Sequence, residues 1–149
     1  VFCSLAFVIP LLVHSFWPVL TFYLTASMVS GLVLSVVFQS AHCVEEASFP
    51  EVKGDPARIE AAWAVHQLET TVDFARRNRL LSWFVGGLNF QIEHHLFPQI
   101  CHVHYAALAK LVEETSREFK LKYAVHDTFL AGLASHFRWL RRMGMPTTA

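Results

Sequence analysis

Val19–Phe38, with the sequence VLTFYLTASMVSGLVLSVVF, is the stretch that decides the fold of this chain. It is 20 residues long, mostly apolar and without a charged residue, which is the length that one membrane-spanning helix needs. Small residues around Gly31 favour close contact with another helix. We therefore expect one membrane span over these residues.

The residues before this stretch are also apolar. Val1–Val13 is too short to cross a bilayer alone, and it predicts the end of a transmembrane helix whose start is missing. His14–Pro18 is typical of an interfacial turn, with Trp17 at headgroup depth. We therefore expect two antiparallel membrane segments within residues 1–40. A buried hairpin of a soluble protein is the disfavoured alternative, because residues 1–44 contain no Asp, Glu, Lys or Arg.

The charges of the chain are confined to its remainder. Its 12 Lys and Arg and 12 Asp and Glu all fall between Glu45 and Arg142. The formal net charge of zero argues against a nucleic-acid surface. The three cysteines have no CxxC spacing and indicate free thiols. We expect an all-α fold, with two transmembrane helical segments followed by a helical cytosolic cap over residues 41–149.

The cap shows several helical patterns. A loop is predicted over Glu45–Asp55, and a re-entrant or cap-packed segment over Leu80–Leu88. Apolar residues at helical spacing predict helices over Arg58–Arg77, over Tyr105–Lys120 with Leu108, Leu111, Val112 and Phe119 on its apolar stripe, and from Phe129 to Leu140. Three arginines near the end of the last helix suit either an anionic cytoplasmic leaflet or a merely solvated face.

Gln91-Ile92-Glu93-His94-His95 is the segment with the clearest chemistry. On a helix, Gln91, His94 and His95 share one face. Neutral imidazole is a good ligand for iron, copper or zinc. A pair of partly exposed histidines is the simpler alternative. The chain has no HExxH pattern, so a zinc hydrolase is not favoured.

His42 lies at the predicted cytoplasmic end of the second span, where it could approach His94 and His95. Gln39 lies one turn earlier on the same face, where it could orient a ligand or bind a metal through water. His66 has Glu69 and Asp73 three and seven residues later. That spacing indicates either a residue supporting the metal ligands or a polar helix face. A site dominated by neutral histidines suits an iron pair that activates oxygen.

The segment 91–95 resembles the third histidine box of membrane fatty acid desaturases, and its leading Gln91 resembles the front-end subgroup of that family. His66–Phe74 and Gly86–Phe90 resemble the stretches that precede this box. The resemblance is clearest from about His42 to Tyr123. It implies that residues 1–149 are the C-terminal part of a desaturase domain, with membrane segments in 1–40 and the third box in the cap.

The resemblance also implies the chemistry and the partners. His42, His94 and His95 would bind a pair of iron ions, and Gln91 and, more weakly, Gln39 would be additional or supporting donors. Dioxygen would be the co-substrate, and the substrate would be an acyl-CoA or acyl-lipid. Electrons would come from a cytochrome b5 or ferredoxin system. The protein would be integral to the bilayer, with the cap on the cytoplasmic side and no nucleic-acid partner.

One departure from the family pattern bears on activity. The two earlier boxes, of the HxxxH and HxxHH kinds, do not occur upstream of His42. We therefore expect this chain to be the C-terminal part of a longer enzyme and to be inactive by itself. A hydroxylase, a ketolase or a sphingolipid desaturase is an alternative within the superfamily. A non-catalytic membrane protein that binds a metal or a lipid is an alternative from another class.

Overall fold

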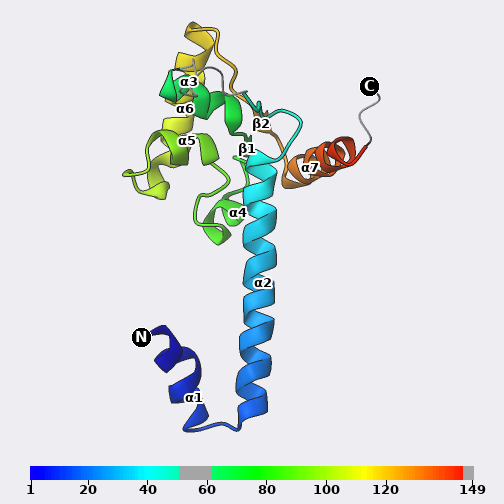
Figure 1. Cartoon of the computed structure of the whole chain (residues 1–149). Coiled ribbons are helices and arrows are strands. Elements are labelled where there is room, and N and C mark those ends of the chain that lie inside the picture. Colours follow the sequence, from blue (N-terminus) through cyan, green and yellow to red (C-terminus); the bar gives the residue numbers. More distant parts are fainter. Residues whose placement is uncertain (51–61, 146–149) are drawn as a thin grey trace, which may run out of the picture. The chain divides into compact units, whose positions relative to one another are not determined.

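The computed structural model describes residues 1–50 and 62–145 and divides the chain into two compact units, Val1–Val36 and Val37–Ala149 (Figure 1). The described residues are mostly helical, which confirms the expected predominance of helix. The all-α expectation missed two short strands, β1 (Asp73–Phe74) and β2 (Val125–His126). Both strands lie in the second unit.

The first unit contains a π-helical turn, η1 (Ser4–Val8), a short helix, α1 (Ile9–Leu11), and most of α2 (Phe16–His42). The ring of Phe7 packs on the ring of Tyr23 with centroids 4.8 Å apart. A cavity of about 590 Å³, lined almost entirely by apolar residues, lies beside them. The expected turn at His14–Pro18 was placed too late, because Phe16 already begins α2. Pro18 fits this first helical turn, where a missing N–H breaks no hydrogen bond.

α2 has 27 residues and is the one helix in the described part of the chain that is long and apolar enough to cross a membrane. At 1.5 Å per residue it is about 40 Å long, which exceeds the ~30 Å hydrocarbon core of a bilayer. Its apolar side chains point outward: Phe22 is 78% and Met28 76% exposed. The helix extends past the predicted span Val19–Phe38 at both ends, and the extension adds one turn that ends at His42.

β1 and β2 form a parallel ladder that organises the second unit. Asp73 pairs with Val125, and Phe74 pairs with His126. The N–H of Val72 donates to the carbonyl of Ala41 at 2.9 Å, which attaches β1 to the end of α2 (Figure 1). The N–H of Phe74 donates to the carbonyl of Asn89 at 3.1 Å. The ladder therefore brings the end of α2 and the segment before residue 91 to the same strand.

α3 (Trp63–Thr70) is shorter than the predicted helix Arg58–Arg77. Residues 58–61 of that prediction lie outside the described residues. The helix ends at Thr70 because Thr70, Thr71 and Val72 are consecutive β-branched residues, which favour extended backbone. Asp73 consequently belongs to β1, so the prediction that it shares a helix face with His66 was wrong.

The remaining elements of the described chain follow in order: α4 (Arg79–Phe84), α5 (Gln91–Leu96), η2 (His102–His104), α6 (Tyr105–Glu118) and α7 (Phe129–Met143). Asn78 caps α4 by accepting from the N–H of Leu81 at 3.0 Å, and Thr128 caps α7 in the same way. Within the described part, residues 43–50 form a loop as expected, while residues 51–55 of the predicted loop are not described.

α6 begins at the expected residue, but its buried stripe differs from the expected one. The buried residues are Tyr105, Ala109, Val112 and Ser116, at the four- and three-residue spacing of a helix face. Leu111 and Phe119, expected on this stripe, are 60% and 66% exposed. The small side chains of Ala109 and Ser116 let the helix approach its neighbours closely, so size rather than hydropathy decided which face is buried.

The turn before α5 depends on two glycines with positive φ, Gly86 at 61° and Gly87 at 78°. A Cβ on Gly87 would lie 2.8 Å from the Cβ of His102, whereas a Cβ on Gly86 would meet nothing within 4 Å. Gly87 therefore satisfies both a left-handed backbone and a close approach to η2. α4 and this turn occupy Leu80–Leu88, for which a re-entrant or cap-packed segment was expected, and both belong to the second unit.

Candidate functional site

Three histidine side chains gather at the end of α2 and in the last turn of α5. The imidazole centroids of His42 and His95 are 5.0 Å apart, and those of His94 and His95 are 5.8 Å apart. An open cavity of about 350 Å³ is lined by His42, His66 and His95, while His94 lies beside His95 outside this lining. The second unit thus brings together residues that are about 50 positions apart in the sequence.

α5 is held in place by a residue from β1. Phe90, which precedes the helix, has no side chain that can accept a hydrogen bond from the first turn. Asp73 supplies the missing acceptor, because its Oδ1 accepts from the N–H of Ile92 at 3.0 Å. Ile92 is fully buried against Leu68 and Val112. A carboxyl cap and an apolar anchor therefore fix the orientation of the helix that carries His94 and His95.

Tyr105 orients the ring of His94. Its hydroxyl lies 3.2 Å from Nδ1 of His94, and Tyr105 is itself buried at the start of α6. A partner on one ring nitrogen leaves the other, Nε2, as the atom that can bind a metal. Sequence reasoning assigned Tyr105 no role beyond the first position of a helix.

His95 is in the protonation state that a metal ligand requires. Burial, and then the neighbouring rings of His42 and His94, lower the pKa of His95 to about 4. The imidazole is therefore neutral at physiological pH, and its lone pair is available for coordination. Burial, with the neighbouring imidazoles adding to it, produces this state.

Two buried carboxyl groups lie beneath the histidines. The hydroxyl of Tyr123 is 2.8 Å from Oε1 of Glu93 and 3.0 Å from Oδ2 of Asp73. Burial raises the pKa of both carboxyls, and the charge of Glu93 raises that of Asp73 further, well above its ordinary value. Asp73 therefore holds a proton more readily than an exposed aspartate, which reduces the repulsion between the two acids.

Arg76 closes this polar network toward the solvent. It donates to the hydroxyl of Tyr123 at 3.1 Å and pairs with Glu113 at 2.9 Å, and its guanidinium stacks 5.3 Å from the centre of the Tyr123 ring. Burial, then the charges of Asp73 and Glu93, raise the pKa of Tyr123, so its hydroxyl keeps its proton and remains a donor. The network links β1, α5, α6 and the segment before β2.

The three supporting residues predicted from the sequence have different surroundings. Gln91 is fully buried, and neither atom of its amide has a hydrogen-bond partner among the described residues. His66 is half-buried and lines the cavity, and its Nδ1 also lacks a partner within residues 1–50 and 62–145. Gln39 is exposed and does not line that cavity. Burying an amide unpaired costs about 1–3 kcal/mol, so Gln91 in particular needs a function to explain it.

The chemistry of these donors fits a metal, but their number is small. Neutral imidazoles and a free amide are suitable ligands for iron. No group of three or more His, Cys, Asp or Glu in the described part of the chain is arranged to hold a metal ion. His42, His94 and His95 remain predicted ligands, and a complete site would need further donors.

The sequence carried a signal for the acid network that went unused. Asp73 lies between Val72 and Phe74, and Glu93 lies between Ile92 and His94. Asp73 has apolar neighbours on both sides and Glu93 on one side, and an acid buried in such a segment must be paired or protonated. Tyr123 and Arg76 could not have been assigned to these acids from spacing, because they come from other elements of the fold.

The family model described as fatty acid desaturase matches residues 1–127. The chain is 48% identical over 118 residues to the sn-1 linoleoyl-lipid 6-desaturase of Arthrospira platensis, covering 79% of this chain and 32% of that protein. It is 41% identical over 133 residues to the acyl-lipid (8-3)-desaturase of Physcomitrium patens, covering 89% and 27%. It is 36% identical over 146 residues to the Delta(5) fatty acid desaturase A of Dictyostelium discoideum, covering 96% and 32%.

The chain therefore spans about a third of the length of these curated relatives. No solved structure matches it. The relatives are front-end desaturases, which confirms the resemblance found in segment 91–95.

Proposed function

Because this chain belongs to the fatty acid desaturase family, we propose that it supplies the third histidine box of a front-end acyl desaturase. Such an enzyme introduces a double bond between an existing one and the carboxyl end of a fatty acyl chain. The observation that carries the proposal is the gathering of His42, His94 and His95 within one unit. The chain alone would be inactive, because the other two boxes of the family are not among its residues.

We assign His42, His94 and His95 as ligands of a non-haem iron pair in the whole enzyme. The chemistry supplied by bound iron is the activation of dioxygen with two electrons, which removes two hydrogens from an unactivated acyl chain. The residues of this chain prepare the ligands for that role. Tyr105 fixes one ring nitrogen of His94, and Asp73 holds the helix that presents both histidines. Burial and the neighbouring imidazoles keep His95 neutral.

Gln91 and His66 are assigned as supporting donors. Both have buried polar atoms without a partner in residues 1–50 and 62–145, and both can bond to groups supplied by the rest of the enzyme. Gln39 is the weakest of the predicted donors, because it is exposed. In the whole protein it could reach the iron site only through water or through another segment.

The substrate and the partners follow from the relatives and from α2. Several relatives are named as acyl-lipid desaturases, so we propose an acyl chain on a lipid, with acyl-CoA as the alternative carrier. We place α2 across the bilayer, with residues 1–13 forming part of a second membrane segment. The second unit would lie on the cytoplasmic side, where a cytochrome b5 or ferredoxin system delivers electrons.

The test uses the full-length gene product expressed in cells that lack front-end desaturation. We expect new double bonds in the membrane lipids and two irons per chain in the purified protein. His94→Ala and His95→Ala should each abolish the new double bonds and lower the iron content. His104→Ala is the matched control, because His104 is exposed on η2 and should have no effect. Unchanged lipid profiles in both box variants would refute the ligand assignment.

A further inference from the structure

α7 carries an apolar stripe on its outward face. Leu130, Phe137 and Leu140 are 73%, 63% and 45% exposed. Their spacing places them on one side of the helix, while Gly132 and Ser135 are buried on the opposite side. A helix that faced water would show the reverse pattern. Large apolar side chains exposed on one face of a helix favour a surface that binds a partner or a membrane.

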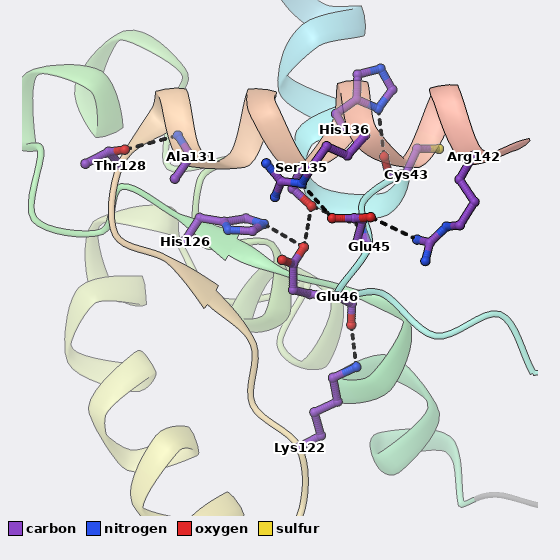
Figure 2. A network of polar contacts seen from close by, with 11 residues as sticks. Cys43, Glu45, Glu46, Lys122, His126, Thr128, Ala131, Ser135, His136 and Arg142 are labelled. Carbon is purple, nitrogen blue, oxygen red and sulfur yellow. Dashed lines mark hydrogen bonds and ion pairs between the residues drawn. The ribbon is translucent and has the colours of Figure 1, made fainter. Parts of the chain in front are cut away.

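The same helix is anchored to the residues that immediately follow α2 (Figure 2). Nδ1 of His136 donates to the carbonyl of Cys43 at 2.7 Å, and the N–H of Glu45 donates to Oγ of Ser135 at 3.1 Å. The hydroxyl of Ser135 donates in turn to the carboxylate of Glu46. Cys43 directly follows the last residue of α2, so α7 is fixed to the chain at the point where that helix ends.

The charges on α7 are divided between this anchor and the outward face. Arg138 Nε lies 2.7 Å from Glu45 Oε2, and Arg142 Nη2 lies 3.5 Å from Glu45 Oε1. Arg141 lies four residues after Phe137, on the same face as the apolar stripe, and it is exposed. The outward face therefore combines large apolar side chains with a cation at one end.

We propose that α7 lies on the bilayer surface as an interfacial amphipathic helix, with Leu130, Phe137 and Leu140 among the outer acyl chains and Arg141 among anionic headgroups. This proposal rests on the part of the proposed function that places α2 across the membrane. If α2 ends at the bilayer surface, the hydrogen bonds to residues 43–46 hold α7 at that surface. Amphipathic helices with a basic residue beside an apolar face bind this boundary.

The test uses the whole 149-residue chain in vesicles of phosphatidylcholine and phosphatidylglycerol, with its three native cysteines changed to serine. A polarity-sensitive fluorophore is attached to a single new cysteine at one of three positions. Phe137→Cys reports on α7. Leu111→Cys on α6 is the matched control, because Leu111 is an apolar residue that is 60% exposed on a helix without the anchor. Met28→Cys reports on the middle of α2.

We expect the label at position 137 to show blue-shifted emission and to lose fluorescence to lipids brominated near the headgroup. The label at position 111 should respond to aqueous iodide, and the label at position 28 to lipids brominated near the bilayer centre. Arg141→Glu should reduce the lipid quenching at position 137 in these vesicles, with a smaller effect in vesicles of phosphatidylcholine alone.

Two outcomes at position 137 would overturn the proposal. A response to iodide equal to that at position 111 would mean that the stripe faces water. A label shielded from both quenchers would mean that protein covers the stripe. The label at position 28 separates this failure from failure of the membrane span: if it is quenched by deep bromines while position 137 is not, α2 stands and only the docking of α7 is wrong.

Discussion

α2 and α5 differ in where their side chains lie: α2 exposes apolar side chains, and α5 buries polar ones. α2 is the longest helix of the described chain, and only 6% of its most apolar window is buried. α5 has six residues, and Gln91 and Glu93 within it are fully buried. In water, apolar side chains turn inward and polar ones outward, so both helices break the usual rule. For α2 the explanation that we propose is a lipid solvent. For α5 it is a site in which Glu93 has a polar partner and Gln91 is proposed to bind a further group.

The largest effect is expected from a charge placed in the middle of α2, which tests whether that helix lies in lipid. Leu32→Arg should disfavour membrane insertion by about 2.5–3.5 kcal/mol, because a guanidinium at the centre of a span must leave water. Insertion can be measured by glycosylation of acceptor sites placed on either side of α2. Gln39→Arg is the control, since Gln39 is exposed near the end of the helix. Equal insertion of the two variants would mean that α2 does not need lipid.

For α5, the corresponding challenge is removal of its cap. Asp73→Ala should destabilise the second unit by about 2–3 kcal/mol, because it leaves the buried N–H of Ile92 without an acceptor. Asp73→Asn keeps an acceptor oxygen and should lose less. Thermal unfolding in detergent, followed by circular dichroism, provides the measurement. Glu113→Ala removes a carboxylate that is only partly buried, so it should cost under about 1 kcal/mol; a loss as large as that of Asp73→Ala would contradict the capping role.

The turn before α5 allows a finer test of how tightly the site is packed. Gly86→Ala should cost about 1 kcal/mol, because it places a Cβ on a left-handed backbone with free space around it. Gly87→Ala should cost more, because its Cβ would also lie 2.8 Å from His102. The difference between the melting temperatures of Gly86→Ala and Gly87→Ala measures the cost of the steric clash with His102. His102→Gly removes the Cβ that would clash. If this change does not reduce the difference between the two melting temperatures, the contact with His102 is not the cause of that difference.

The smallest expected effect is electrostatic and concerns the anchor of α7. Burial alone would raise the pKa of Glu46, but the hydroxyl of Ser135 and the charges of His126 and Arg138 bring it below the ordinary 4.5. The stabilisation is therefore present above pH 4.5 and is lost as the pH falls through the lower pKa of the folded state. Because Glu46 is partly exposed, we expect well under about 1 kcal/mol.

The measurement for Glu46 is the melting temperature of the wild type minus that of Glu46→Gln across this acidic range. The difference should be constant above pH 4.5 and should shrink below it. A difference that grows on acidification would mean that folding raises, rather than lowers, the pKa of Glu46.

The sequence was sufficient for the parts of this chain that depend on local pattern. Val19–Phe38 predicted α2 because a mostly apolar, uncharged run of this length is typical of a membrane-spanning helix. The positions of His94 and His95 on one helix followed from their spacing. The bounds of α6 and α7 were close for the same reason, since their amphipathic periods are long.

What failed depended on contacts between distant segments. After α3 ends at Thr70, the N–H of Val72 pairs with Ala41 and that of Asp73 with Ala124, and neither pairing has a local signal. The cap of α5 comes from another element, so Asp73 was assigned to His66 instead. The stripe of α6 was misplaced because Ala109 and Ser116 are buried for their small size. Local periodicity does not encode these choices.

The hydrogen bond between Tyr123 and Asp73 has a consequence for biosynthesis. The two residues are 50 positions apart, and at about 5–20 residues per second a ribosome needs roughly 3–10 s to add the tyrosine after the aspartate. Until Tyr123 has been added, Asp73 and Glu93 lack the phenol whose hydroxyl contacts both carboxyls. The nascent chain therefore completes the support of its histidines last, after α2 has been made.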